Sequence, residues 1–127
     1  MSPPEARGLR GLARVLLAFV CHAAVAVSAA EQPAADATGK RIYDLRCFPC
    51  HGLDGRGDGP TAAMIAPEPR NFRDPEFWRA RTIEQVRLAV RQGRPGTLMP
   101  PFQGVLSEAD IDAVVAYLQS AFASGQR

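Results

Sequence analysis

Five consecutive residues, Cys47-Phe48-Pro49-Cys50-His51, carry the most distinctive chemistry in this sequence. The two thiols are three positions apart, so on a helical turn both can add to the two vinyl groups of a single haem. The histidine that follows at once would then lie under the iron and coordinate it. Such a C-x-x-C-H run is the attachment signature for haem of the c type. The motif predicts one covalent haem c, with Cys47 and Cys50 as attachment points and His51 as an iron ligand.

Three other kinds of site compete for these residues, and each explains fewer of them. A structural zinc site needs four nitrogen or sulfur ligands, and only three such residues follow residue 30. A thioredoxin-like C-x-x-C pair should follow a strand in a βαβ pattern, and no strand-like alternation precedes Cys47. A plain disulfide would leave His51 without a role.

Residues 1–30 have the pattern of a targeting segment. Arg7, Arg10 and Arg14 precede a mostly apolar stretch, and the small residues up to Ala30 offer a cleavage site. We therefore expect a signal peptide over 1–30 and a mature protein in the periplasm. The apolar stretch is shorter than the roughly 20 residues of a membrane-spanning helix. We expect no membrane span after cleavage, although an uncleaved anchor is an alternative.

The remaining chain is long enough for one small domain, which we expect at residues 38–127 after a flexible lead-in at 31–37. Residues 1–30 hold three of the 15 basic and one of the 13 acidic residues, so the rest carries 12 of each. This balance gives no indication of nucleic acid binding. So short a domain has a marginal core, which a large apolar group at its centre would complete.

Three helices are expected from capping residues and apolar spacing. The first runs from Thr38 as N-cap through Cys50. The second begins at Thr82, with Gln85 completing a capping box, and ends at Gly93. The third begins at Ser107 with Asp110 as box partner. The apolar faces of the second and third helices are Ile83, Val86 and Val90, and then Ile111, Val114, Val115, Leu118 and Phe122.

The stretch between the first two helices, residues 52–80, is rich in glycine and proline. A long irregular segment in a small domain usually wraps around something. No segment alternates with the period of a strand, so the fold class is all-α. We expect three main helices around one haem, with long Gly/Pro-rich loops.

With these features, residues 38–122 resemble a class I cytochrome c. Gly39 and Tyr43 match the first helix of that family, in which a glycine and an aromatic residue meet the last helix. Val114, Tyr117 and Leu118 match the other half of that crossing. Glycine has no Cβ, so it would let the two helix backbones approach closely.

The resemblance also implies a second axial ligand. Met99 lies in the loop Gly96-Thr97-Leu98-Met99-Pro100-Pro101-Phe102, which resembles the family's distal ligand loop. Its two prolines fix φ and stiffen the loop. We expect Met99 to bind the iron. Met64 follows His51 too closely to reach the opposite face, so we expect it to fill the core instead.

Further residues near the haem follow from the same resemblance. Pro60 resembles the proline whose carbonyl accepts the Nδ1–H of the ligand histidine. Arg70 and Trp78 are candidates for binding a haem propionate.

An iron held by histidine and methionine has no open position, which favours one-electron transfer over catalysis. We expect a monomeric, non-enzymatic carrier of a bacterial respiratory chain. Its partners would be a dehydrogenase, reductase or oxidase. Near-neutral charge predicts an apolar docking patch, with Phe48, Pro49, Pro100 and Phe102 as candidates, and a weak dependence on salt. Two alternatives are a cytochrome subunit docked to one dehydrogenase or oxidase, and a ligand-binding or catalytic haem protein with a displaceable Met99.

Overall fold

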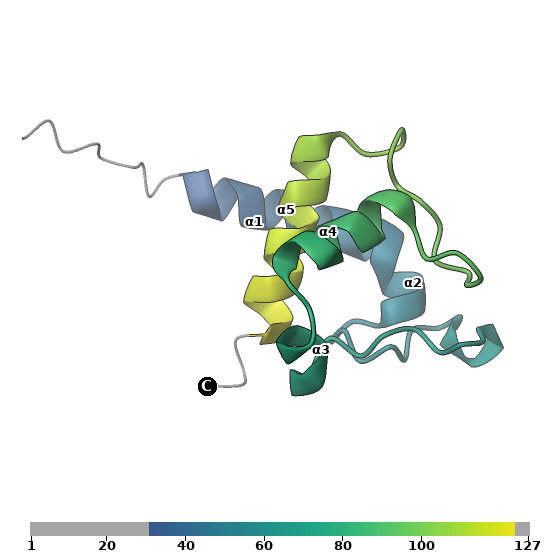
Figure 1. Ribbon diagram of the computed structural model, residues 1–127. Coiled ribbons are helices and arrows are strands. Elements are labelled where there is room, and N and C mark those ends of the chain that lie inside the picture. Colours follow the sequence, from purple (N-terminus) through teal and green to yellow (C-terminus); the bar gives the residue numbers. More distant parts are fainter. Residues whose placement is uncertain (1–30, 124–127) are drawn as a thin grey trace, which may run out of the picture.

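The computed structural model describes residues 31–123, and this part of the chain is helical (Figure 1). The predicted signal peptide at 1–30 lies outside the described residues. No helix within 31–123 is long and apolar enough to cross a membrane. In chain order the elements are α1 (Glu31–Ile42), the π-helical turn η1 (Tyr43–Cys47), α2 (Phe48–His51), the 3-10 turn η2 (Ala62–Met64), α3 (Pro75–Arg79), α4 (Ile83–Gln92), α5 (Glu108–Leu118) and the π-helical turn η3 (Gln119–Ala123).

The first helix begins earlier than the sequence analysis predicted. It starts at Glu31 rather than after Thr38, so the stretch expected to be a loose lead-in is helical. Alanine recurs in this stretch and is the strongest helix former, and a proline in a first turn loses no intrahelical bond. The N-cap chemistry of Thr38 is therefore outweighed by alanine on its N-terminal side. Beyond Ile42 the helix continues through η1 into α2, as predicted.

The two terminal helices cross at Gly39, as expected. A Cβ at this position would lie 2.7 Å from Cβ of Tyr117 and would collide with the carbonyl of Ala113. Only glycine therefore allows α1 to approach α5 this closely (Figure 1). Tyr43 lies at the crossing with no exposed surface, and its ring packs 5.6 Å from that of Tyr117 and 5.2 Å from that of Phe122.

Helices α4 and α5 begin where their capping residues predicted. The side chains of Thr82 and Gln85 cap each other's backbone N–H groups at the start of α4, and Gly93 ends that helix. Ser107 and Asp110 form the same box at α5. Of the expected apolar positions, only Ile83 is exposed. The buried core consists of Ile42, Tyr43, Phe72, Phe77, Val86, Val90, Ile111, Val114, Val115, Leu118 and Phe122.

The segment between α2 and α4 is irregular, as predicted, apart from η2 and α3. Neither short element was expected from the sequence. The side chain of Asp74 caps α3 by accepting the backbone N–H of Glu76 at 2.9 Å. No strand occurs within residues 31–123, so the described part is all-α. In Figure 1 this segment runs below α4 and leads from α2 to α3.

Candidate functional site

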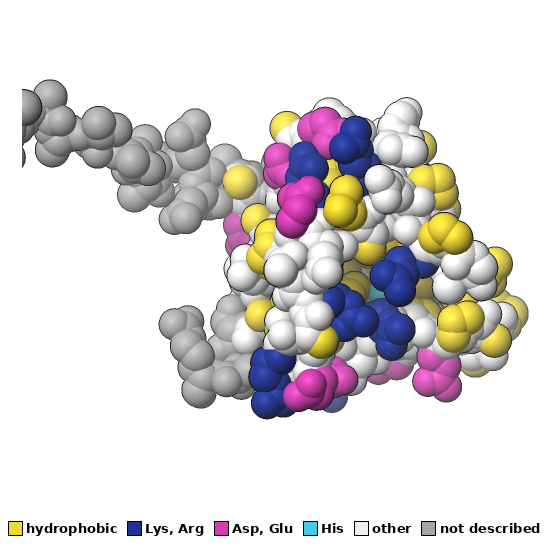
Figure 2. Space-filling model, in the orientation of Figure 1, with side chains coloured by type: hydrophobic (Ala, Val, Ile, Leu, Met, Phe, Trp, Pro, Cys, Tyr) yellow, Lys and Arg dark blue, Asp and Glu magenta, His cyan; other side chains and the backbone are white. Residues whose placement is uncertain are grey.

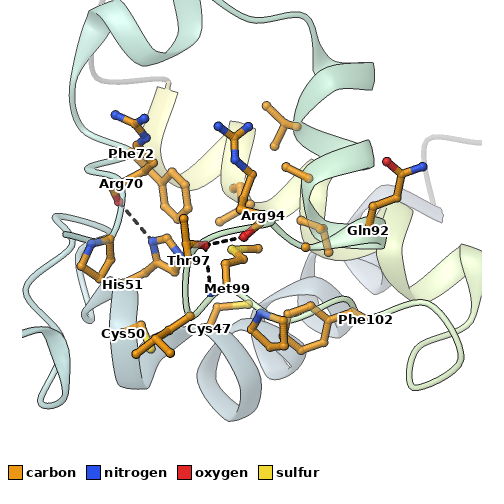
Figure 3. A pocket seen from close by; sticks show the side chains of 18 of the residues that line it. Cys47, Cys50, His51, Arg70, Phe72, Gln92, Arg94, Thr97, Met99 and Phe102 are labelled. Atoms are coloured by element: carbon orange, nitrogen blue, oxygen red, sulfur yellow. Dashed lines mark hydrogen bonds between the residues drawn. The ribbon is translucent and has the colours of Figure 1, made fainter. Parts of the chain in front are cut away.

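A cavity of about 1000 Å³ opens on the face shown in Figure 2. Cys47, Cys50 and His51 contribute to its wall from η1 and α2, and Met99 contributes from the loop after α4 (Figure 3). Its volume is at the upper end of ligand pockets, which span about 300–1,000 Å³. The apolar lining includes Ile65, Pro67, Pro69, Phe72, Phe77, Val86, Val90, Leu98, Pro100, Phe102 and Leu118.

The C-x-x-C-H turn is held by the chain that follows it. The amide of Gly57 donates to the carbonyl of His51 at 2.8 Å, and that of Gly59 donates to Cys50 at 3.1 Å. Thr61 donates to the carbonyl of Pro49 through both its amide, at 3.0 Å, and its hydroxyl, at 2.7 Å. The folded-back loop thus satisfies the carbonyls of the motif and fixes the direction of its side chains.

Both cysteines are free thiols on the cavity wall, so the plain disulfide is not formed. Burial raises the pKa of the Cys47 thiol to about 12, which keeps it protonated at neutral pH. The sulfur of Cys50 lies 3.4 Å from Oγ1 of Thr61. Within residues 31–123 there is no cluster of three or more His, Cys, Asp or Glu side chains that could hold a metal, as the zinc alternative would need.

His51 is buried, and its orientation leaves one ring nitrogen available. Its Nδ1–H donates to the carbonyl of Arg70 at 3.1 Å, and its ring stacks on Phe72 at 4.5 Å (Figure 3). Burial lowers the pKa of the imidazole, against the opposing effect of the Arg70 carbonyl. The ring is therefore neutral with its proton on Nδ1, and Nε2 presents the lone pair that a metal ligand needs.

The prediction for Pro60 is wrong, since the carbonyl of Arg70 accepts the histidine N–H. Pro60 is exposed, because the bonds of Thr61 hold this stretch against the outside of α2. The chain turns back to the histidine only at Pro69-Arg70. The sequence analysis expected the carbonyl of Pro60 itself, whereas the accepting carbonyl belongs to Arg70, the residue after Pro69.

Met99 is positioned by a loop that closes on itself and on α4. The amide of Met99 donates to Oγ1 of Thr97 at 3.2 Å, and that hydroxyl donates to the carbonyl of Arg94 at 2.7 Å (Figure 3). The amide of Arg94 donates to the Met99 carbonyl at 3.1 Å. Gly93 has φ +68°, and a Cβ there would lie 2.7 Å from the Met99 carbonyl oxygen. Glycine at this position therefore lets the loop return to the end of α4.

Met64 and Trp78 lie outside the cavity. Met64 is 77 % exposed, so it does not fill the core as expected. The indole N–H of Trp78 donates to the carbonyl of Phe72 at 2.7 Å, and its ring packs against Phe77 at 4.9 Å. The propionate role predicted for Trp78 is not retained, because its only donor is committed to the backbone.

Arginines surround the mouth of the cavity, and of these only Arg70 was expected from the sequence. Arg46, Arg70, Arg81 and Arg94 line it together with one acidic residue, Glu68. Within the described part of the chain, no carboxylate pairs with any of these four arginines. Figure 2 shows the basic side chains gathered around the hollow, with the histidine visible inside it. Two of them could have been predicted from the sequence, because Arg46 directly precedes Cys47 and Arg94 directly follows Gly93 at the end of α4.

Comparison with known proteins agrees with this geometry. The family model described as Cytochrome c matches residues 37–122. The chain belongs to the cytochrome c family. Members bind haem c covalently and transfer electrons, and the paired thiols, the available imidazole nitrogen, the thioether and the arginines of the cavity suit that group. When bound, its iron supplies a one-electron couple. The predicted class I c-type cytochrome and its all-α fold are confirmed.

Several known proteins are similar to this chain over part or nearly all of their own length. The cytochrome is 39% identical over 90 residues to dihydro-heme d1 dehydrogenase of Pseudomonas aeruginosa, covering 69% of this chain and 16% of that protein. It is 29% identical over 110 residues to cytochrome c55X of Paracoccus denitrificans, covering 84% of this chain and 94% of that one. It is 28% identical over 102 residues to the Cbb3-type cytochrome c oxidase subunit CcoP of Rubrivivax gelatinosus, covering 80% and 30%.

A solved structure is also similar. A chain of the reducing HAO-like protein complex of Kuenenia stuttgartiensis matches with a TM-score of 0.63 and 32% identity, covering 69% of this chain and 44% of that one. The cytochrome therefore spans less than half of three of these four relatives and nearly the whole of the fourth. Cytochrome c domains of this kind occur both within larger redox proteins and nearly alone.

Proposed function

We propose that this protein is an exported single-haem electron carrier of the periplasm. In this proposal Cys47 and Cys50 would hold the haem, and His51 and Met99 would bind its iron. The observation that carries the proposal is the arrangement of the cavity, with the thiols and a neutral imidazole in one segment and a thioether fixed in another. Two protein ligands leave no position for a substrate, so the protein is a carrier and not an enzyme.

The partner of this carrier is a redox protein with an acidic docking surface. Even if Arg70 binds a propionate, Arg46, Arg81 and Arg94 remain around the opening through which an electron would pass. Unpaired charges at such a mouth attract an oppositely charged partner and raise the rate of encounter. The names of the relatives, a dehydrogenase and an oxidase subunit, support a partner of either kind.

This arginine rim changes the docking expected from the sequence. Of the four residues proposed for an apolar patch, Pro100 and Phe102 line the cavity, whereas Phe48 and Pro49 do not. The balanced charge of the chain hid the clustering, because only one of its acidic residues, Glu68, lines the cavity with these four arginines. Electron transfer should therefore depend strongly on salt, since charges at a surface are screened beyond about 10 Å at 0.1 M.

Ligation is tested by comparing two methionine variants of the holoprotein. Met99→Ala should remove the weak far-red absorption band that a thioether gives to ferric haem, and should admit carbon monoxide to the ferrous iron. Met64→Leu should change neither, because that side chain lies on the surface. An intact far-red band in Met99→Ala would refute the ligation. A wild-type protein that already binds carbon monoxide would instead favour the alternative of a displaceable Met99.

Docking is tested by measuring electron transfer to an acidic redox protein at increasing salt. The rate should fall steeply from low to moderate ionic strength, and Arg46→Gln with Arg94→Gln should flatten that fall. Arg79→Gln is the matched control, because Arg79 is exposed, does not line the cavity and pairs with Glu76 at 2.6 Å. A rate independent of salt would restore the apolar docking patch. Copurification with an enzyme would identify a docked subunit rather than a free carrier.

A further inference from the structure

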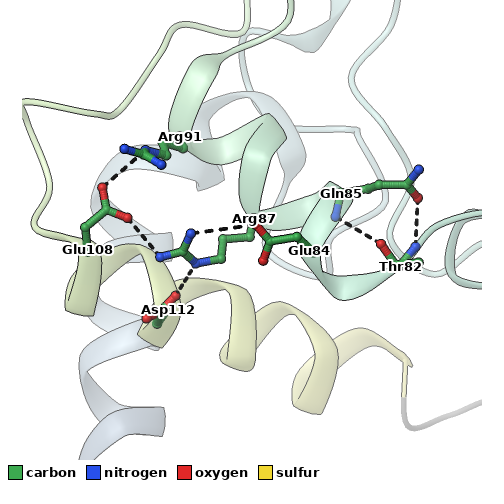
Figure 4. A network of polar contacts seen from close by, with 7 residues as sticks. All are labelled: Thr82, Glu84, Gln85, Arg87, Arg91, Glu108 and Asp112. Carbon is green, nitrogen blue, oxygen red and sulfur yellow. Dashed lines mark hydrogen bonds and ion pairs between the residues drawn. The ribbon is translucent and has the colours of Figure 1, made fainter.

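An ion-pair network joins α4 to α5 on the outside of the molecule (Figure 4). Arg87 contacts Asp112 through Nε at 2.5 Å and Glu108 through Nη2 at 2.9 Å. Arg91 contacts the other oxygen of Glu108 through Nε at 3.2 Å. We call these four residues the clamp. Its centre is Glu108, whose two carboxylate oxygens each face a different arginine.

The clamp lies at the base of the loop that carries Met99. Arg91 is in the last turn of α4, and Glu108 is the first residue of α5, so their contact joins the two ends of that loop. Arg91 also holds the loop through its backbone, because its carbonyl accepts the amide of Gln103 at 3.0 Å. The carbonyl of Val90 likewise accepts the amide of Phe102 at 3.1 Å.

The environment of the clamp makes its members depend on one another. The Arg87 side chain is only 22% exposed, so its ion pairs are partly shielded from solvent. Nε of Arg91 is buried and has no hydrogen bond within the described residues, so the nearby carboxylate of Glu108 is what compensates its charge. Neutralising Glu108 would leave this buried N–H without its counter-charge, and α4 would be free to shift at the turn that anchors the loop.

We infer that the clamp is a positioning device for Met99, with Glu108 as its central residue. It holds the end of α4 against the start of α5 and thereby keeps the loop closed over the cavity. None of its members lines the cavity, so the clamp can act on Met99 only through the backbone and packing of that loop. The inference rests on Met99 being the axial ligand of the proposed function.

The test compares Glu108→Gln with Glu76→Gln in the full-length holoprotein. Glu76 is the matched control, because it forms an exposed ion pair on α3, away from the loop. Glu108→Gln should speed amide hydrogen exchange of Phe102 and Gln103 several-fold and increase imidazole binding to the ferric iron. Asp112→Asn should give a smaller effect in the same direction, because it leaves the pair between Arg91 and Glu108 in place.

The outcomes separate the clamp from the ligation. Equal exchange and equal imidazole binding in Glu108→Gln and Glu76→Gln would overturn the clamp. Faster exchange spread evenly over all helices, with a matching loss of thermal stability, would also overturn it, since that result describes general destabilisation. If Met99→Ala keeps the far-red band, the proposal that Met99 binds the iron is wrong, whatever the result with the Glu108 variant. Faster exchange confined to the loop in Glu108→Gln would then still show that the clamp holds the loop.

Discussion

The hydroxyl of Thr97 should control how often Met99 leaves the iron. This hydroxyl links two parts of the loop, because it accepts a hydrogen bond from the amide of Met99 and donates one to the carbonyl of Arg94. Valine has nearly the same shape and no hydroxyl, so Thr97→Val removes both bonds without opening a large space. The backbone bond from Arg94 to the Met99 carbonyl remains. The variant should therefore fold but hold its loop less firmly.

The expected magnitude follows from the two bonds that are lost. A hydrogen bond contributes about 0.5–1.5 kcal/mol net, so the closed loop should lose about 2 kcal/mol relative to an open one. That difference corresponds to a roughly 30-fold larger population of the open form. An external ligand that binds only the open form gains the same factor in apparent affinity, as long as the open form stays rare.

Imidazole titration of the ferric holoprotein measures this population. Thr97→Val should bind imidazole about 30-fold more tightly than the wild type. Thr61→Val is the control, because it removes a threonine hydroxyl bond of the same 2.7 Å length from the proximal side of the site. An unchanged affinity in Thr97→Val, or an equal gain in Thr61→Val, would refute the reasoning.

Two further predictions concern the crossing of the terminal helices. Gly39→Ala should lower the free energy of unfolding by about 1–3 kcal/mol, because its Cβ would lie 2.7 Å from that of Tyr117; an unchanged denaturant midpoint would contradict this. Tyr43→Phe should lower the free energy of unfolding by about 1–3 kcal/mol at neutral pH, because the buried phenol donates a hydrogen bond to the carbonyl of Gly52 at 2.6 Å. Burial raises the pKa of Tyr43, so the wild type keeps its full stability below about pH 10 and loses it as pH rises further. In Tyr43→Phe the free energy of unfolding should fall less between pH 8 and pH 11 than it does in the wild type. If the denaturation midpoints of both proteins fall equally over this range, the reasoning is wrong.

The features predicted well from sequence depend on local chemistry or on one residue type. The capping boxes at Thr82 and Ser107 are fixed by hydrogen bonds within four residues, so the sequence shows them directly. Gly39 could be placed from the resemblance to class I cytochromes c, and the missing Cβ explains why the crossing needs glycine there. The C-x-x-C-H motif likewise brings its three groups together within one turn.

The features that could not be predicted depend on the path of the irregular chain. Whether Pro60 or Arg70 meets His51 is decided by how residues 52–70 fold back, and their hydrogen bonds link positions that sequence periodicity does not relate. The same holds for the gathering of arginines, which come from four separate segments. The composition gives the number of arginines, but only the folded structure shows that these four lie on one face.

The contact between α1 and α5 has a consequence for the order in which the protein matures. The C-x-x-C-H motif leaves the ribosome well before α5, so the glycine crossing cannot form until most of the chain has been made. During that interval the two thiols are not yet enclosed by the helix that completes the core. The late helix pair thus leaves a period in which Cys47 and Cys50 can react with haem before the core is complete. Once α5 packs against Gly39 and Tyr43, Leu118 of α5 completes the cavity wall, and a chain that missed the haem would keep a large, mostly apolar hollow open on its surface.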